Sequence, residues 1–470
     1  MPSIILKSFH GGINQKTSQI LMRIEEARML KNVDVDEIGT LKKTKGYSLF
    51  GNVPNASSVL GLVAFYKIGT TIERMLLRDG GGEVRKFNFS TNQWDAITGA
   101  TGLSTTKKPV WIIYQNLAIR FNGVDSPKKY DGITFGNLGG NPFNGDVATL
   151  FKERIYVAGV SPNFSTIYFS KTGDPEGWLS GNSTVINQND GDRIMALKGL
   201  GDSLLVFKEK SIWEIQVDNK NFPAVKRPLA LNIGTTSQFS LVENQGVLYF
   251  FDRNGIYQIT GKYPELISLK VEPIIKGVQD PYGIFGWSSG TKNYWWFGNV
   301  KLEDKVINNV ILVYDVMLDF WSLMIVPHQL TSAVEFIGDD KLKKIYLGNS
   351  VGRTYLFLDG YQFENKPIEF LYESPNLIVG DPLSEKIFRK IIIRTKNKIG
   401  GTPSVFVFID DEPEAIITDI CDKTYKTIEL PPNKNVGREI KIVLAETSKE
   451  DMRDVYLLEI VYDEVISERI

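Results

Sequence analysis

Apolar residues along most of the chain occur in short runs rich in Val, Ile, Tyr, Phe and Trp, separated by Gly, Asn, Asp and Pro. This pattern is typical of an all-β protein, because β-branched and aromatic side chains favour strands and the intervening residues favour turns. The exception is 20–31, where apolar residues such as Ile24 and Leu30 recur at helical spacing among Arg and Glu. The sequence therefore predicts one short helix over 20–31, with Ser18 as its N-cap, followed by strands.

The apolar runs fall into groups of about four that recur roughly every 40 to 45 residues, which is the period of a β-propeller blade. The first unit contains the runs 60–66, 74–78 and 84–89 and ends at Trp94. Its turn, Asp79-Gly80-Gly81-Gly82, suits a hairpin because glycine adopts positive φ without strain. Later units are 110–135, 148–186, 194–215, 247–259, 294–323 and 333–358.

This division predicts roughly seven blades, with six or eight left open. Several stacked β-sandwiches are the alternative, and the even recurrence of the units favours the propeller. Many units also close on an aromatic residue near a turn, and such residues are expected in the core whatever the function. These aromatic residues are Trp94, Phe135, Trp178 and Trp321.

The composition changes after Gly360, where Pro367, Pro375 and Pro382 interrupt the chain. The strands expected beyond this point suit a small antiparallel sandwich of about 100 residues. We therefore predict an N-terminal arm with a short helix over 1–56, a β-propeller of about six to eight blades over 57–365, and a C-terminal β-sandwich-like domain over 366–470. The strands expected in the last part are 405–409, 427–430, 440–444 and 457–462.

The charge balance excludes a strong global attraction to nucleic acid or membranes, since 54 basic residues face 55 acidic ones. A single cysteine, Cys421, cannot form an intrachain disulfide, which suits assembly in the cytoplasm. No apolar run approaches the ~18 residues of a membrane helix, and the N-terminus lacks the pattern of a secretory signal peptide. We expect no membrane span.

Residues suited to catalysis are scarce. His10 and His328 supply the chain's imidazoles, and neither lies in a nucleophile motif or at a zinc-ligand spacing from Cys421. Segment 187–192 faintly resembles a calcium loop, but Lys198 stands where that loop requires glutamate. Because a phosphate-binding glycine motif is also missing, the sequence predicts no catalytic residue, no metal site and no cofactor.

One segment invites comparison with an enzyme. Residues 170–178, Ser-Lys-Thr-Gly-Asp-Pro-Glu-Gly-Trp, loosely resemble the Asp-box of sialidases, which is a blade-turn element and not their catalytic site. The arginine triad of sialidases cannot be located here. Acidic residues that could form the carboxylate pair of another glycoside hydrolase are plentiful. The sequence does not identify such a pair, because the diagnostic quantity is the distance between the two carboxylates in space. A glycan-cleaving enzyme stays an alternative.

The N-terminal segment carries a family resemblance. It reads Phe9-His10-Gly11-Gly12-Ile13-Asn14, then the expected helix bearing Ala27, then Asn32-Val33-Asp34-Val35, Gly39-Thr40-Leu41-Lys42-Lys43 and Gly46-Tyr47. The order and spacing resemble the opening of β-propeller tail proteins of tailed phages. Segments 167–212 and 437–462 are similar to the middle and the C-terminal β domain of the same proteins.

The resemblance implies a non-enzymatic virion protein of the tail, of the accessory, DNA-stabilisation or nozzle type found in short-tailed phages. Identical copies would form a ring, with a hexamer as one copy number, around the DNA channel and link the portal region to the distal tail. Expected partners are other copies, the portal or adaptor, other tail proteins and tail fibres, with transient sequence-independent contact to channel DNA. Assembly would take place in the host cytoplasm.

The candidate assembly residues come from the same N-terminal segment, and Lys42 and Lys43 also fit a plain solvated turn. The alternative function is a propeller that binds a host receptor or glycan and, in one version, cleaves it. The candidate interface residues are Gly11, Gly12, Asn14, Lys42 and Lys43.

Overall fold

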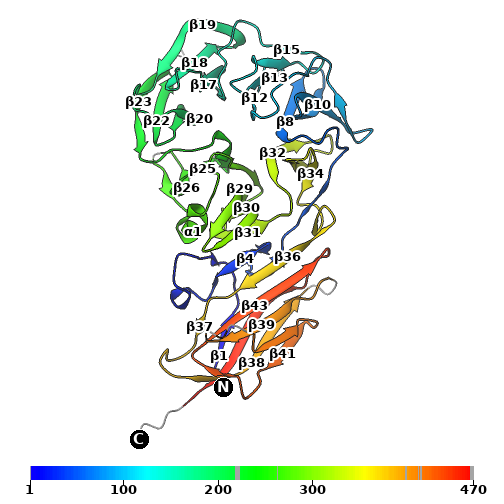
Figure 1. The fold of residues 1–470 in the computed structure, drawn as a ribbon, viewed down its shortest axis with the longest axis vertical. Coiled ribbons are helices and arrows are strands. Elements are labelled where there is room, and N and C mark those ends of the chain that lie inside the picture. The colour runs from blue at the N-terminus through cyan, green and yellow to red at the C-terminus, as the bar shows by residue number, and fades with distance from the viewer. Residues whose placement is uncertain are drawn as a thin grey trace.

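The computed structural model describes residues 2–217, 223–261, 263–396, 400–410, 412 and 415–465. Strands dominate it, which confirms the all-β prediction (Figure 1). The helical elements of the described residues are one short α-helix and three 3-10 turns. They are η1 (Gln19–Leu21), η2 (Gln238–Ser240), η3 (Leu269–Val271) and α1 (Glu272–Lys276).

Five separate four-stranded antiparallel sheets form consecutive propeller blades. Each is an up-and-down meander, as expected when turn residues separate strands in regular succession. Blade 1 comprises β8 (Val59–Ile68), β9 (Ile72–Gly80), β10 (Glu83–Asn88) and β11 (Gln93–Ala96); blade 2 β12 (Val110–Tyr114), β13 (Leu117–Phe121), β14 (Lys128–Tyr130) and β15 (Phe135–Asn137); blade 3 β16 (Val147–Phe151), β17 (Arg154–Ala158), β18 (Thr166–Lys171) and β19 (Asp174–Val185); blade 4 β20 (Ile194–Leu200), β21 (Ser203–Lys208), β22 (Ser211–Val217) and β23 (Pro223–Leu231); and blade 5 β24 (Val242–Asn244), β25 (Val247–Asp252), β26 (Gly255–Ile259) and β27 (Glu265–Leu266).

The strands expected to form the last two blades belong instead to a 15-stranded sheet, which corrects the predicted six to eight blades to five. Two meanders in this sheet are joined through one strand of the N-terminal arm and two strands of segment 362–373, and the sheet continues into the C-terminal part, giving a nearly closed, barrel-like sheet. The meanders are β28 (Phe285–Ser289), β29 (Lys292–Leu302), β30 (Lys305–Asp315) and β31 (Phe320–Ile325), and β32 (Leu330–Ile337), β33 (Lys343–Asn349) and β34 (Thr354–Phe357) with β7 (Tyr47–Leu49); the connecting strands are β4 (Met29–Lys31), β36 (Lys366–Glu373) and β35 (Gln362–Phe363); and the C-terminal members are β37 (Leu377–Ile378), β39 (Ser404–Ile409), β40 (Ile417–Ile420) and β43 (Glu439–Ser448).

The meanders follow one another around a ring, and between blades 4 and 5 the contact runs from β20 through η2 to β25. Strand β8 contacts β12 and β32, β12 contacts β16, β16 contacts β20, and β28 contacts β24 and β32. The first strands therefore surround the middle of the propeller, while β19 and β23 lie at its outer edge (Figure 1).

A second, seven-stranded sheet lies at the other end of the molecule, where the N-terminus lies close to β1 and β38 (Figure 1). It combines both ends of the sequence, because Ser3–Leu6 pairs with β44 along its length. Apolar side chains from this sheet and from the C-terminal strands of the 15-stranded sheet share one core. The C-terminal sandwich-like domain itself stays a prediction. The strands are β41 (Tyr425–Glu429), β38 (Lys386–Lys396), β44 (Asp454–Glu464), β6 (Leu41–Lys43), β5 (Val33–Val35), β1 (Ser3–Leu6) and β42 (Val436–Gly437).

The predicted helix over 20–31 is wrong. The segment forms η1, then β3 (Glu26–Ala27), which pairs in parallel with β2 (Gly12–Ile13), and then β4 between β31 and β36. Ile20 and Leu21, the first apolar residues of the predicted helix, are 55% and 76% exposed and do not pack against a core. Ser18 precedes η1 but makes no capping hydrogen bond through its side chain. Strand pairing with distant segments therefore overrides the local helical spacing.

Candidate functional site

The two glycines of the N-terminal motif lie where the arm passes β31. A side-chain carbon on Gly12, which has φ +70°, would lie 2.8 Å from the backbone nitrogen of Trp321. One on Gly11 would lie 2.5 Å from the backbone of Glu25. The Gly11 carbonyl also accepts a hydrogen bond from Lys270 Nζ at 3.0 Å. Both glycines therefore permit close backbone approach within the chain.

Replacing Gly12 with Ala is expected to destabilise the fold more than replacing Gly173 with Ala. Both glycines have φ near +70°, but nothing lies within 4 Å of a side-chain carbon at Gly173. Gly173→Ala should thus lower the free energy of unfolding by about 1 to 2 kcal/mol, which is the cost of the left-handed backbone alone. Gly12→Ala adds the overlap with Trp321, which should cost about 1 to 3 kcal/mol more. Urea unfolding measures both, and equal losses would refute this account of Gly12.

Asn14 is buried and fixes the turn that follows the glycines. Its Oδ1 accepts hydrogen bonds from the backbone N–H groups of Lys16 and Thr17 at 3.2 and 3.1 Å, and its Nδ2 donates to Glu26 Oε2 at 3.0 Å. Burial alone raises the pKa of Glu26, but hydrogen bonds from Asn14 and the Arg23 backbone, with the ammonium of Lys270, hold it below its ordinary value. The asparagine therefore serves an intrachain network.

Lys43 is fully buried against the C-terminal part, which overturns the alternative of a solvated turn. Its Nζ lies 2.6 Å from Glu446 Oε2 and also contacts Ser448 O, Glu450 O and Ser448 Oγ at 2.9 to 3.1 Å. Burial lowers the pKa of Lys43, and Glu446 opposes that shift. Its neighbour Lys42 stays partly exposed and pairs with Asp36 at 3.0 Å.

The five candidate interface residues thus converge on the arm, but four of them meet other parts of the same chain. Lys42 is the member whose side chain remains available to solvent. Their role in assembly stays a prediction, and their observed contacts join the arm to the propeller and to the C-terminal sheets. No local sequence signal reveals these contacts, because the partners of Lys43 lie about 400 residues away.

The residues considered for catalysis each have separate structural partners. His10 lies 3.0 Å from Ser8 Oγ and 2.8 Å from the Asp36 carbonyl. His328 contacts the Tyr47 hydroxyl at 2.8 Å, and burial lowers its pKa. Burial raises the pKa of the Cys421 thiol to about 12, which disfavours the reactive thiolate. That the chain is not an enzyme stays a prediction.

The calcium-like segment 187–192 folds around a cation supplied by the chain itself. Lys208 is fully buried in β21, and its Nζ lies 2.5 Å from Asp190 Oδ2 and 3.3 Å from the carbonyls of Ile186 and Asn187. The loop oxygens thus receive an ammonium group. Across the described part of the chain, no cluster of three or more His, Cys, Asp or Glu side chains is arranged to hold a metal ion.

The segment that resembles an Asp-box is a β18–β19 hairpin that contacts blade 2. Ser170 Oγ accepts a hydrogen bond from the Ile155 backbone, and Trp178 Nε1 donates to the Pro175 carbonyl at 2.9 Å. Glu176 pairs with Lys129 of β14 at 2.8 Å. Its contacts are those of a structural turn. Trp178 is half-buried, whereas Trp94, Phe135 and Trp321 are buried as expected.

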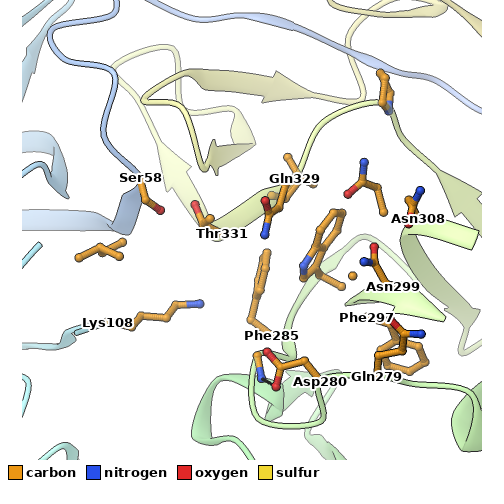
Figure 2. A pocket seen from close by; sticks show the side chains of 17 residues that line it. Ser58, Lys108, Gln279, Asp280, Phe285, Phe297, Asn299, Asn308, Gln329 and Thr331 are labelled. Carbon is orange, nitrogen blue, oxygen red and sulfur yellow. Dashed lines mark hydrogen bonds between the residues drawn. The ribbon is translucent and has the colours of Figure 1, made fainter. Parts of the chain in front are cut away.

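A cavity of about 730 Å³ lies near the middle of the propeller, beside the first strands β8, β28 and β32 (Figure 2). We call it the central cavity. Phe285 is buried beside it, and Lys108, which precedes β12, extends toward Phe285 (Figure 2). Desolvation lowers the pKa of Lys108 to about 7. No motif in the sequence distinguishes this lysine from its neighbours. Polar residues at the cavity include Ser58, Gln279, Asp280, Asn299, Asn308, Gln329 and Thr331.

Comparisons with known proteins show no family for this chain. No helix within the described residues is long and apolar enough to cross a membrane. No protein-family model matches the chain, and no curated protein does.

Among solved structures the chain is similar to the RRP9 WD40 repeats, with 7% identity and a TM-score of 0.43 over 67% of this chain and 99% of that one. It is also similar to the WD40 β-propeller domain of Doa1, with 12% identity and a TM-score of 0.41 over 66% and 97%. A third similar structure is the Pan2 WD40 domain of Neurospora crassa, with 10% identity and a TM-score of 0.38 over 66% of this chain and 96% of that one. None of the three is a phage tail protein, and these likenesses concern the β-propeller fold alone.

Proposed function

We propose that this chain is a structural protein of a phage tail, which forms a ring of identical copies around the DNA channel and links the portal region to more distal tail parts. The observation that carries the proposal is the N-terminal motif string from Phe9 to Tyr47 and its resemblance to propeller tail proteins. Its residues Gly12 and Lys43 lie where the arm meets the propeller and the C-terminal sheets, and Asn14 fixes a turn within the arm.

A continuous core supports the proposal, because a ring that carries load requires rigid subunits. One hydrophobic cluster extends from Ile13 and Leu30 in the arm through Trp321 in β31 to Leu444 and Ile460 in the C-terminal sheets. Close-packed cores transmit displacement with little deformation. The propeller and the C-terminal part would therefore move as one body, as a tail subunit must during DNA ejection.

Exposed apolar side chains on different blades also support ring formation. A ring of identical copies needs two different complementary surfaces on each subunit. Leu179 on β19 and Val225 on β23 are exposed at the outer strands of blades 3 and 4. A second exposed set, Ile68, Ile72 and Ile133, lies on blades 1 and 2. We assign these sets to the two sides of the subunit contact.

Light scattering and negative-stain imaging of the purified protein, alone and mixed with its virion partners, test the proposal. We expect a closed ring with a central channel. Leu179→Glu combined with Val225→Glu should shift the protein toward monomer, because burying a carboxylate in an apolar contact is costly. Leu383→Glu, at a site that is 82% exposed in the C-terminal part, is the matched control. A chain that stays monomeric under all these conditions would refute the ring.

A further inference from the structure

Lys108 places an ammonium group at the central cavity without an acidic partner. No hydrogen bond or ion pair to any described residue occupies its Nζ, and desolvation alone accounts for its lowered pKa. The Nζ lies 4.3 Å from the ring centres of both Phe239 and Phe285. Aromatic faces attract a cation but replace little of its hydration, so the charge stays open to an anion.

The mouth of the same cavity offers groups suited to hydroxyls. Gln279, Asn299, Asn308 and Gln329 are exposed at the cavity, and no hydrogen bond to a described residue occupies their side-chain amides. Each amide can donate and accept, which matches a sugar hydroxyl, itself both donor and acceptor. In Figure 2, Lys108 approaches from one side, while Gln279, Asn299 and Asn308 lie on the other.

Apolar surface completes the site. Phe285, Trp296 and Phe297 are buried residues that line the cavity, and Figure 2 shows Phe285 between Lys108 and the amides. A volume of about 730 Å³ falls within the range of small-ligand sites, which combine apolar walls with a few polar groups. The lining also holds one carboxylate, Asp280, whose Oδ1 accepts hydrogen bonds from the backbone N–H groups of Tyr282 and Gly283. One cation, several amides and aromatic walls therefore favour a ligand with many hydroxyls and a single negative charge at its Lys108 end, where it avoids repulsion by Asp280.

We propose that the central cavity binds an acidic saccharide, with the ligand's carboxylate on Lys108 and its hydroxyls on the amides of Gln279, Asn299, Asn308 and Gln329. The site lies in the middle of the propeller, away from the arm, and does not depend on ring formation. Binding would give a tail component, or any other propeller, a contact with a surface glycan.

The proposal predicts a particular pH dependence. The carboxylate needs the charged amine, which is half protonated near pH 7 in the free protein. As pH rises above 7, the observed affinity should fall by up to about tenfold per pH unit until the pKa of bound Lys108 is passed, because binding must take up a proton. Below pH 7, down to the range where the ligand carboxyl protonates, affinity should vary little.

Isothermal titration of the full chain with sialyllactose, an oligosaccharide that carries one carboxylate on its terminal sugar, and with the methyl ester of sialyllactose provides the test. We expect the acid to bind and the ester to bind at least about tenfold more weakly, since it lacks the charge. At pH 8, titration in two buffers of different ionisation enthalpy should show proton uptake with the acid. Lys108→Met should weaken binding of the acid by about tenfold or more and abolish the uptake.

Lys107→Met is the matched control, because Lys107 is the exposed neighbour in the chain and should leave affinity and proton uptake unchanged. Lys108→Met should fold at least as well as the natural chain, since it removes an unpaired amine from an apolar setting, and circular dichroism checks this. Equal binding of acid and ester, binding of inorganic phosphate or of a short single-stranded oligonucleotide but not of the saccharide, or no binding at millimolar concentrations would overturn the proposal. None of these outcomes affects the ring.

Discussion

Replacing Lys43 with Met is expected to lower the free energy of unfolding by about 3 to 5 kcal/mol, because it leaves a buried carboxylate without its partner. The side chains of Lys43 and Glu446 are 0% and 4% exposed, and the ammonium also satisfies two backbone carbonyls of the C-terminal part. Urea unfolding followed by circular dichroism measures the loss. Hydrogen exchange should also show β6 opening from its C-terminal neighbours.

Two companion variants distinguish the buried pair from a general effect of charge. Lys42→Met removes the partly exposed pair with Asp36 and should cost less than about 1 kcal/mol. Lys43→Met combined with Glu446→Leu removes both buried charges and should recover much of the stability, since paired apolar replacements of buried ions are often close to neutral. If Lys43→Met behaves like Lys42→Met, the buried pair does not hold the arm.

Replacing Trp321 with Ala should cost about 3 to 5 kcal/mol, which is typical for deleting a fully buried aromatic side chain. Trp321 is 1% exposed in β31 and stacks on Tyr314 with ring centres 4.4 Å apart, beside Trp295 at 6.3 Å. The adjacent Gly12 places the arm against its backbone. The deletion therefore opens a cavity where the arm, propeller and C-terminal sheets share one core.

Trp178→Ala serves as the control for the loss of a tryptophan. Trp178 is half-buried on the outer strand of blade 3 and keeps a single hydrogen bond to the Pro175 carbonyl. Its truncation should cost clearly less than that of Trp321, because less apolar area leaves contact with protein. Urea unfolding by circular dichroism compares the two. A smaller loss for Trp321 than for Trp178 would contradict the shared core.

The sequence by itself determined the strands and the turns of the blades. Strand β43 shows why: its residues from Glu439 onward alternate between partly exposed and buried, which is the period of a strand with one covered face. The turn glycines Gly81 and Gly82 adopt the positive φ that their sequence predicts. Such features depend on neighbours a few residues apart, which a single sequence displays.

Only the tertiary structure decided how many blades stand alone and which polar groups are buried. The predicted helix gave way to β4 because its partners, β31 and β36, lie about 300 residues further along the chain. The sequence pattern around Lys43 fits a solvated turn, but in the structure Lys43 is buried against Glu446. Lys108 differs from other lysines because its ammonium group lies against Phe239 and Phe285, which come from other parts of the propeller. Burial and charge pairing depend on contacts between distant segments, and these contacts cannot be predicted from the local sequence pattern.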